Sequence, residues 1–104
     1  MAELARTKSP LCLVRLTYRQ PADALDRLMP EHAAWLERCI ADDLLLVGGR
    51  QAPRTGGVLI FRGHKAEVEA LANSDPFVTN GAATIEVIEF VASFAADGFA
   101  ALLQ

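Results

Sequence analysis

Two side chains that could move a proton at neutral pH stand far apart in this sequence, His32 and Asp75. An imidazole titrates near neutrality, and a carboxylate beside it can orient the ring and stabilise its charged form. His32 falls on the apolar stripe of a helical pattern, whereas Asp75 opens an Asp-Pro-Phe turn that ends at Phe77. If the fold brings the two together, the pair predicts general acid–base chemistry.

Each of the two residues also has an ordinary structural explanation. His32 could be a histidine at the edge of the core that makes a single hydrogen bond. Asp75 precedes Pro76, and Asp followed by Pro is typical of a helix start, where the carboxylate caps free N–H groups. Capping and catalysis are compatible, because one carboxylate oxygen could cap while the other faces His32.

Hydrophobic periodicity and turn residues predict the elements that must position the pair. We expect strands at 11–18, 44–49, 58–62 and 84–91, helices at 21–43 and 65–73, a turn at 74–77 and a loop at 78–82. Pro30 interrupts the first helix and predicts a kink or a restart there. His32 would then lie near the start of a helical segment, where free N–H groups and the helix dipole keep an imidazole neutral.

The predicted order βαββαβ indicates an α+β fold of the ferredoxin-like type, one antiparallel sheet with two helices on one face. The strand at 11–18 is apolar on both faces, apart from Arg15 and Thr17. Such a strand needs a second cover, and a second copy of the chain is the simplest one, which predicts a dimeric α/β barrel. We expect a single domain over 1–104, with its core at about 11–93 and an apolar tail at 94–104 that is a candidate for dimer contacts.

Composition narrows the choice of partners and compartment. The formal net charge is −3 and no basic cluster is present, which argues against nucleic acid. No apolar run approaches the ~20 residues that a membrane helix needs, and the first ten residues lack a signal peptide's apolar region, so we expect a cytoplasmic protein. Cys12 and Cys39 fall in apolar segments without metal-ligand spacing and predict buried free thiols, with no metal site.

Four short motifs in this order and spacing resemble the YciI-like (YCII-related) family. They are Glu-His-Ala-Ala-Trp-Leu at 31–36, Leu-Leu-Val-Gly-Gly at 45–49, Gly-Gly-Val-Leu-Ile at 56–60 and Ser-Asp-Pro-Phe at 74–77. The resemblance implies a dimeric α/β barrel related to muconolactone-isomerase and small monooxygenase barrels. It also implies that His32 and Asp75 form the active site. At least one member of the family is similar in sequence to enzymes that dehydrochlorinate hydroxylated aromatics.

One departure from the family concerns recognition of a substrate anion. The family often has an arginine three residues before the helix histidine, where this chain has Met29. Arg15, Arg50 or Arg54 could substitute for it, and the sequence does not select among the three. We take Arg15, Gly49 and Phe77 as the candidate substrate contacts; Gly49 could equally reflect tight packing of the chain, and Phe77 the core.

These observations predict a small-molecule enzyme in which neutral His32 transfers a proton on an aromatic or lactone-like substrate while Asp75 orients it. Isomerisation, elimination and dehydrochlorination need only this pair, and no cofactor is implied. The alternative is a non-catalytic domain that binds a metabolite in the same pocket, or one that serves only for dimerisation.

Overall fold

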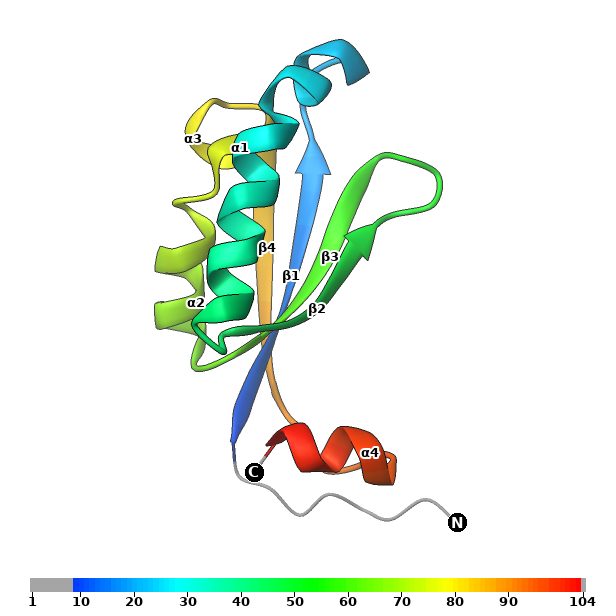
Figure 1. Cartoon of the computed structure of the whole chain (residues 1–104), viewed down its shortest axis with the longest axis vertical. Helices are drawn as coiled ribbons and strands as arrows, with labels where there is room; N and C mark the ends of the chain where they lie inside the picture. The colour runs from blue at the N-terminus through cyan, green and yellow to red at the C-terminus, as the bar shows by residue number, and fades with distance from the viewer. Residues whose placement is uncertain (1–8, 104) are drawn as a thin grey trace.

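The computed structural model describes residues 9–103, which form a four-stranded sheet with helices on one face (Figure 1). The elements in chain order are β1 (Pro10–Tyr18), α1 (Ala22–Ala41), β2 (Leu45–Arg50), β3 (Gly56–Arg62), α2 (Lys65–Ala72), α3 (Pro76–Thr79), β4 (Ala83–Val91), α4 (Asp97–Ala100) and the 3-10 helix η1 (Ala101–Leu103). The strands lie in the order β2-β3-β1-β4, and each neighbouring pair is antiparallel. The predicted α+β fold with its ferredoxin-like antiparallel sheet is therefore confirmed.

The core lies between the sheet and the helices, and β1 is at its centre. Cys12, Val14 and Leu16 alternate along β1 and are almost fully buried against the helices. Val14 pairs with Leu59 of β3 and with Val87 of β4, so a continuous apolar row crosses three strands. α1 packs against this row of side chains.

An extra residue changes the alternation in β2. Leu45 pairs with Phe61 and Val47 pairs with Ile60, so Leu46 has no partner opposite it in β3. Beyond this bulge Gly48 pairs with Leu59 and Arg50 pairs with Gly57. Since Leu59 and Gly57 face the helices, Arg50 is brought to the helical side of the sheet.

The predicted restart of the helix at Pro30 is wrong, whereas a kink there stays a prediction. α1 runs without interruption through Pro30, whose ring lies on the exposed side of the helix. A proline removes one N–H group, and a carbonyl left unpaired on this side remains accessible to water. His32 consequently lies in the middle of α1, and the prediction that a helix start surrounds it is also wrong.

A one-turn helix replaces part of the predicted turn and loop. α3 begins at Pro76, and Asp75 is its N-cap, because the side chain accepts a hydrogen bond from the backbone N–H of Phe77. The helix-start pattern of Asp followed by Pro therefore indicates the local structure correctly, whereas the assignment of 78–82 as a loop begins two residues too early.

Among residues 9–103, apolar side chains stay exposed on the outer face of the sheet and in the C-terminal tail. Ile88 and Phe90 of β4 are 51% and 40% exposed. The tail forms α4 and η1 beyond one end of the sheet, where Leu103 packs with Leu11 and Ala92 (Figure 1). Within the described residues, no helix is both long and apolar enough to cross a membrane.

Candidate active site

α1 and α3 bring His32 and Asp75 into direct contact. His32 Nδ1 lies 2.7 Å from Asp75 Oδ1. Both residues are buried, with exposed fractions of 7% for His32 and 0% for Asp75. Burial removes competing water, so this hydrogen bond is stronger and more sharply oriented than a surface pair would be.

One oxygen of Asp75 carries both of its hydrogen bonds. Oδ1 accepts from the imidazole of His32 and, at 3.0 Å, from the backbone N–H of Phe77. Oδ2 is buried without a hydrogen-bond partner among the residues described. The expectation that the two oxygens divide capping and contact with His32 is therefore wrong, because a single atom ties the histidine to the start of α3.

Two aromatic rings fix the plane of the imidazole. The ring of Phe77 stacks on His32 with centroids 3.9 Å apart and planes 5° apart. The ring centroid of Trp35, also on α1, lies 6.2 Å from that of His32. Trp35 Nε1 donates a hydrogen bond to Ser74 Oγ at 3.0 Å. Since Ser74 immediately precedes Asp75, the tryptophan also anchors the turn that carries the carboxylate. The imidazole therefore has little freedom to rotate.

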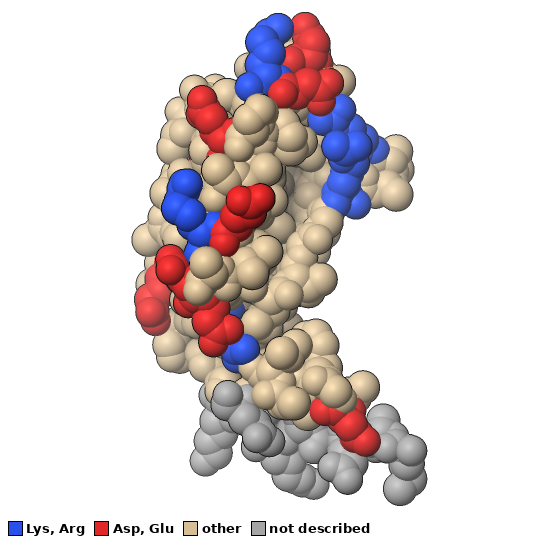
Figure 2. All heavy atoms as spheres, in the orientation of Figure 1, with Lys and Arg blue, Asp and Glu red and all other residues tan. Residues whose placement is uncertain are grey.

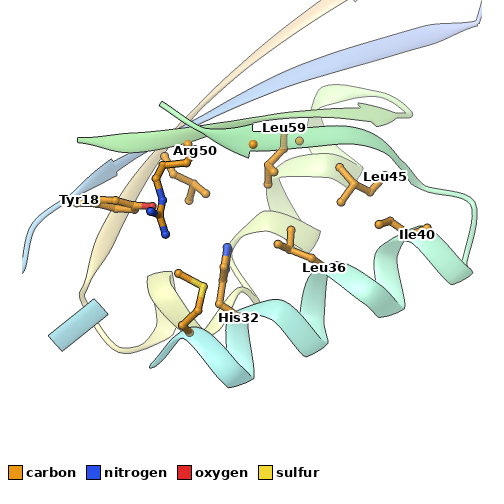
Figure 3. Close-up of a pocket in the computed structure, with 12 residues that line it drawn as sticks. Tyr18, His32, Leu36, Ile40, Leu45, Arg50 and Leu59 are labelled. Carbon is orange, nitrogen blue, oxygen red and sulfur yellow. The ribbon is translucent and has the colours of Figure 1, made fainter. Parts of the chain in front are cut away.

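A pocket opens between α1 and the sheet in front of His32. Its volume is about 240 Å³. Figure 3 shows the imidazole pointing from α1 toward the sheet, and Arg50 extending from β2 into the same space. Because Nδ1 is held by Asp75, Nε2 is the ring nitrogen left to meet a ligand. The walls are largely apolar and consist of Leu16, Met29, Leu36, Ile40, Leu45 and Leu59, with Tyr18 and glycines of β2 and β3 beside them.

The predicted substrate contacts fall in three different places. Gly49 lines the pocket, and a Cβ atom there would meet nothing within 4 Å, so crowding does not require a glycine. Phe77 stacks against His32 from inside the core and does not line the pocket. Arg15 is exposed on the opposite face of the sheet, between Val58 and Glu86, so the structure does not bring it to His32.

Of the arginines that the sequence leaves open, only Arg50 lines the pocket. Arg54 is held by Asp26 at 2.7 Å, and the hydrogen bond that Arg54 donates to this carboxylate raises the pKa of its guanidinium. Sequence alternation could not select Arg50, because the bulge in β2 reverses the faces of the residues that follow it.

The cysteines lie inside the core as free thiols, as predicted. Burial raises the pKa of the Cys12 thiol, with a smaller contribution from Glu89, and burial likewise raises the pKa of the Cys39 thiol. Across residues 9–103, no group of three or more His, Cys, Asp or Glu side chains could hold a metal ion.

The fold and the site together define a class: a ferredoxin-like α+β protein in which a buried histidine–carboxylate pair faces a small apolar pocket. The YCII-related domain model matches residues 12–91, and the chain belongs to this family. No curated protein sequence matches the chain.

Two enzymes are among the solved structures that resemble the chain. One is 5-chloro-2-hydroxyhydroquinone dehydrochlorinase (TftG) from Burkholderia phenoliruptrix AC1100, in complex with 2,5-dihydroxybenzoquinone. It is 26% identical, with a TM-score of 0.59 over 77% of this chain and 90% of the other. The other is a mutant of SnoaB, a cofactor-independent oxygenase from Streptomyces nogalater, at 17% identity and a TM-score of 0.47 over 83% of this chain and 94% of that one.

Proposed function

We propose that the protein is a small-molecule enzyme in which His32 and Asp75 transfer a proton on an aromatic or lactone-like substrate. The observation that carries this proposal is the 2.7 Å contact between the buried carboxylate and an imidazole that lines a pocket. A histidine used only as packing has no need of a carboxylate partner and a cavity on its opposite side.

In the proposed step, Nε2 of neutral His32 removes a proton from an acidic hydroxyl or carbon of the substrate. Asp75 holds the Nδ1 proton, fixes the tautomer and stabilises the imidazolium that forms. The same Nε2 then returns the proton to another position of the substrate or releases it to solvent. A positioned acid–base group of this kind contributes about 10²–10⁴-fold to a rate.

The pocket and the family relationship favour a ring-shaped substrate. An apolar cavity of about 150 Å³ can hold a benzene ring, and this pocket measures about 240 Å³. The dehydrochlorinase in the comparison removes hydrogen chloride from a hydroxylated aromatic, as its name states. That chemistry requires a base that accepts one proton as chloride departs, and His32 oriented by Asp75 can serve as this base.

We also propose that the functional unit is a homodimer. Leu13, Ile60 and Phe90 lie on the outer face of the sheet, where the helices of residues 9–103 cover only the end near Leu11. Apolar faces of this kind are commonly buried against another layer. A second copy placed there would give the dimeric α/β barrel predicted from the sequence.

The test is turnover of hydroxylated, chlorinated aromatics, beginning with 5-chloro-2-hydroxyhydroquinone, followed by chloride release. We expect His32→Asn to lose turnover by at least about 10²-fold while its affinity for 2,5-dihydroxybenzoquinone is retained. Turnover that survives in His32→Asn would overturn the proton-transfer mechanism. A wild-type protein that binds ring compounds and converts none of them would instead be the non-catalytic binding domain.

A further inference from the structure

Arg50 brings a positive charge into a pocket that is otherwise apolar. It is the last residue of β2 and pairs with Gly57 of β3, which has no side chain to fill the space beside it. Figure 3 shows its side chain extending from the sheet into the space toward which the imidazole of His32 points. The cation and the proposed base therefore face one cavity from opposite walls.

The charge of Arg50 has no counterion among residues 9–103. Arg54 and Arg62 pair with Asp26 and Asp43, whereas no carboxylate in that range lies within ion-pairing distance of Arg50. The residues that line the pocket include no aspartate or glutamate. Arg50 is exposed to solvent, so water solvates its charge in the free protein, and an anionic ligand that enters the pocket gains a positive partner there.

The hairpin that follows Arg50 carries one further arginine. The connection from Arg50 to Gly56 contains Arg54 and no acidic residue. Figure 2 shows basic side chains along the hairpin between β2 and β3, but Asp26 of α1 pairs with Arg54 at 2.7 Å. Arg50 is therefore the arginine of this hairpin whose charge is not paired among residues 9–103.

We infer that Arg50 is the anion-recognising residue of this pocket, and that the ligand is a ring-sized molecule with an ionised oxygen substituent: a phenolate, an enolate or a carboxylate. A guanidinium can donate two parallel hydrogen bonds to such a group. The apolar body of the ligand lies against Leu16, Leu36 and Leu59, which turns another ring position toward His32. The assignment rests on the proposed function for the reaction at His32, whereas the preference for an anion depends on Arg50 alone.

The experiment compares two ring compounds by calorimetric titration at neutral pH. The first is 2,5-dihydroxybenzoquinone, an acidic hydroxyquinone that is ionised at this pH, and the second is hydroquinone, a neutral ring with two hydroxyl groups. The variants are Arg50→Gln, Arg50→Lys and, as a matched control with the same loss of charge, Arg38→Gln on the exposed side of α1. Circular dichroism establishes that each variant is folded.

We expect the wild type to bind the quinone anion at least about 10-fold more tightly than hydroquinone. Arg50→Gln should weaken binding of the anion by about 10–100-fold and change hydroquinone binding by less than about twofold, because hydrogen bonds between charged groups are the stronger ones. Arg50→Lys should recover part of the loss, and Arg38→Gln should behave as wild type.

Four results would overturn the inference: a wild type that does not bind the anion or does not prefer it, anion binding that is unchanged in Arg50→Gln, an equal loss for both rings in that variant, or an equal loss in Arg38→Gln. Its failure can be told apart from failure of the proposed function. Unchanged anion binding in Arg50→Gln, together with turnover lost in His32→Asn, removes the role of Arg50 and leaves the proton transfer. Anion binding that depends on Arg50, together with turnover that survives in His32→Asn, removes the proton transfer by His32 and leaves the role of Arg50.

Discussion

His32 Nδ1 and Asp75 Oδ1 are 2.7 Å apart, and this oxygen also accepts the backbone N–H of Phe77 at 3.0 Å. The atom that orients the imidazole is therefore the atom that starts α3. A change that moves the first turn of α3 also moves the carboxylate on which the histidine depends. Local helix capping and the geometry of the site are one interaction in this protein.

Two substitutions of Asp75 separate the effect of its charge from the effect of its helix cap. Asp75→Asn keeps an oxygen for the N–H of Phe77 but loses the negative charge, so the protein should fold while turnover falls by about 10²-fold or more. Asp75→Ala also removes the cap and should lower the free energy of unfolding by about 1–3 kcal/mol. Denaturant unfolding and chloride release measure the two effects. Glu37→Gln removes an exposed carboxylate from α1 and is the control for loss of one negative charge. Normal turnover in Asp75→Asn would contradict the role of the Asp75 charge.

Phe77 should be important for stability. Its ring is fully buried and stacks 3.9 Å from the imidazole of His32. Phe77→Ala leaves a cavity in the core and should lower the free energy of unfolding by about 3–5 kcal/mol. Phe94→Ala, at a position that is 78% exposed, should change it by less than about 0.5 kcal/mol. Urea titration of both variants tests the difference, and equal losses would show that Phe77 is not a packing centre of the core.

The buried thiols predict a loss of stability at alkaline pH. Burial raises the pKa of Cys12 and Cys39 above the usual 9.0 in the folded protein. Above that value the unfolded chain releases protons that the folded chain retains, so the free energy of unfolding falls as pH rises, by up to about 1.4 kcal/mol per pH unit for each thiol. Unfolding measured from about pH 8 upward should show a decline that is shallower in the Cys12→Ala, Cys39→Ala double variant. An identical pH dependence of unfolding in the wild type and the double variant would contradict this role of the thiols.

The outer sheet face should control assembly. Ile88 is 51% exposed on this face, and Ile88→Glu places a charge where we propose that a second copy packs. Sedimentation velocity should show a dimer for the wild type and a monomer for Ile88→Glu. Ala34→Glu adds the same charge to the exposed side of α1 and should remain dimeric. A monomeric wild type, or a dimer that tolerates Ile88→Glu, would exclude this face as the interface.

Much of the fold follows from patterns that the sequence displays openly. The βαββαβ order comes from periodicity, and the start of α3 follows from Asp75 and Pro76. The uninterrupted α1 did not follow, because the cost of an interior proline is local, whereas the packing of Trp35 and Cys39 that holds the helix together is tertiary.

The candidate site was predictable in part. The resemblance to the family pairs His32 with Asp75, and the structure places them in contact. The division of hydrogen bonds within the carboxylate was not predictable, because it depends on sub-ångström placement of α3 against α1. The choice of Arg50 over Arg15 was hidden for a different reason: it depends on strand register, and an unpaired residue in β2 leaves no mark in the pattern of apolar residues.

The bulge at Leu46 determines which face of the sheet carries the charge of Arg50. If Leu46 paired with Ile60 and β2 had no bulge, Gly49 would lie opposite Gly57, and the arginine would turn to the far side of the sheet. The amino acids of the cavity would be nearly the same, yet its electrostatic character would be lost. The face of the sheet on which this charge lies thus depends on how the edge strand β2 pairs with β3, as well as on the identity of its residues.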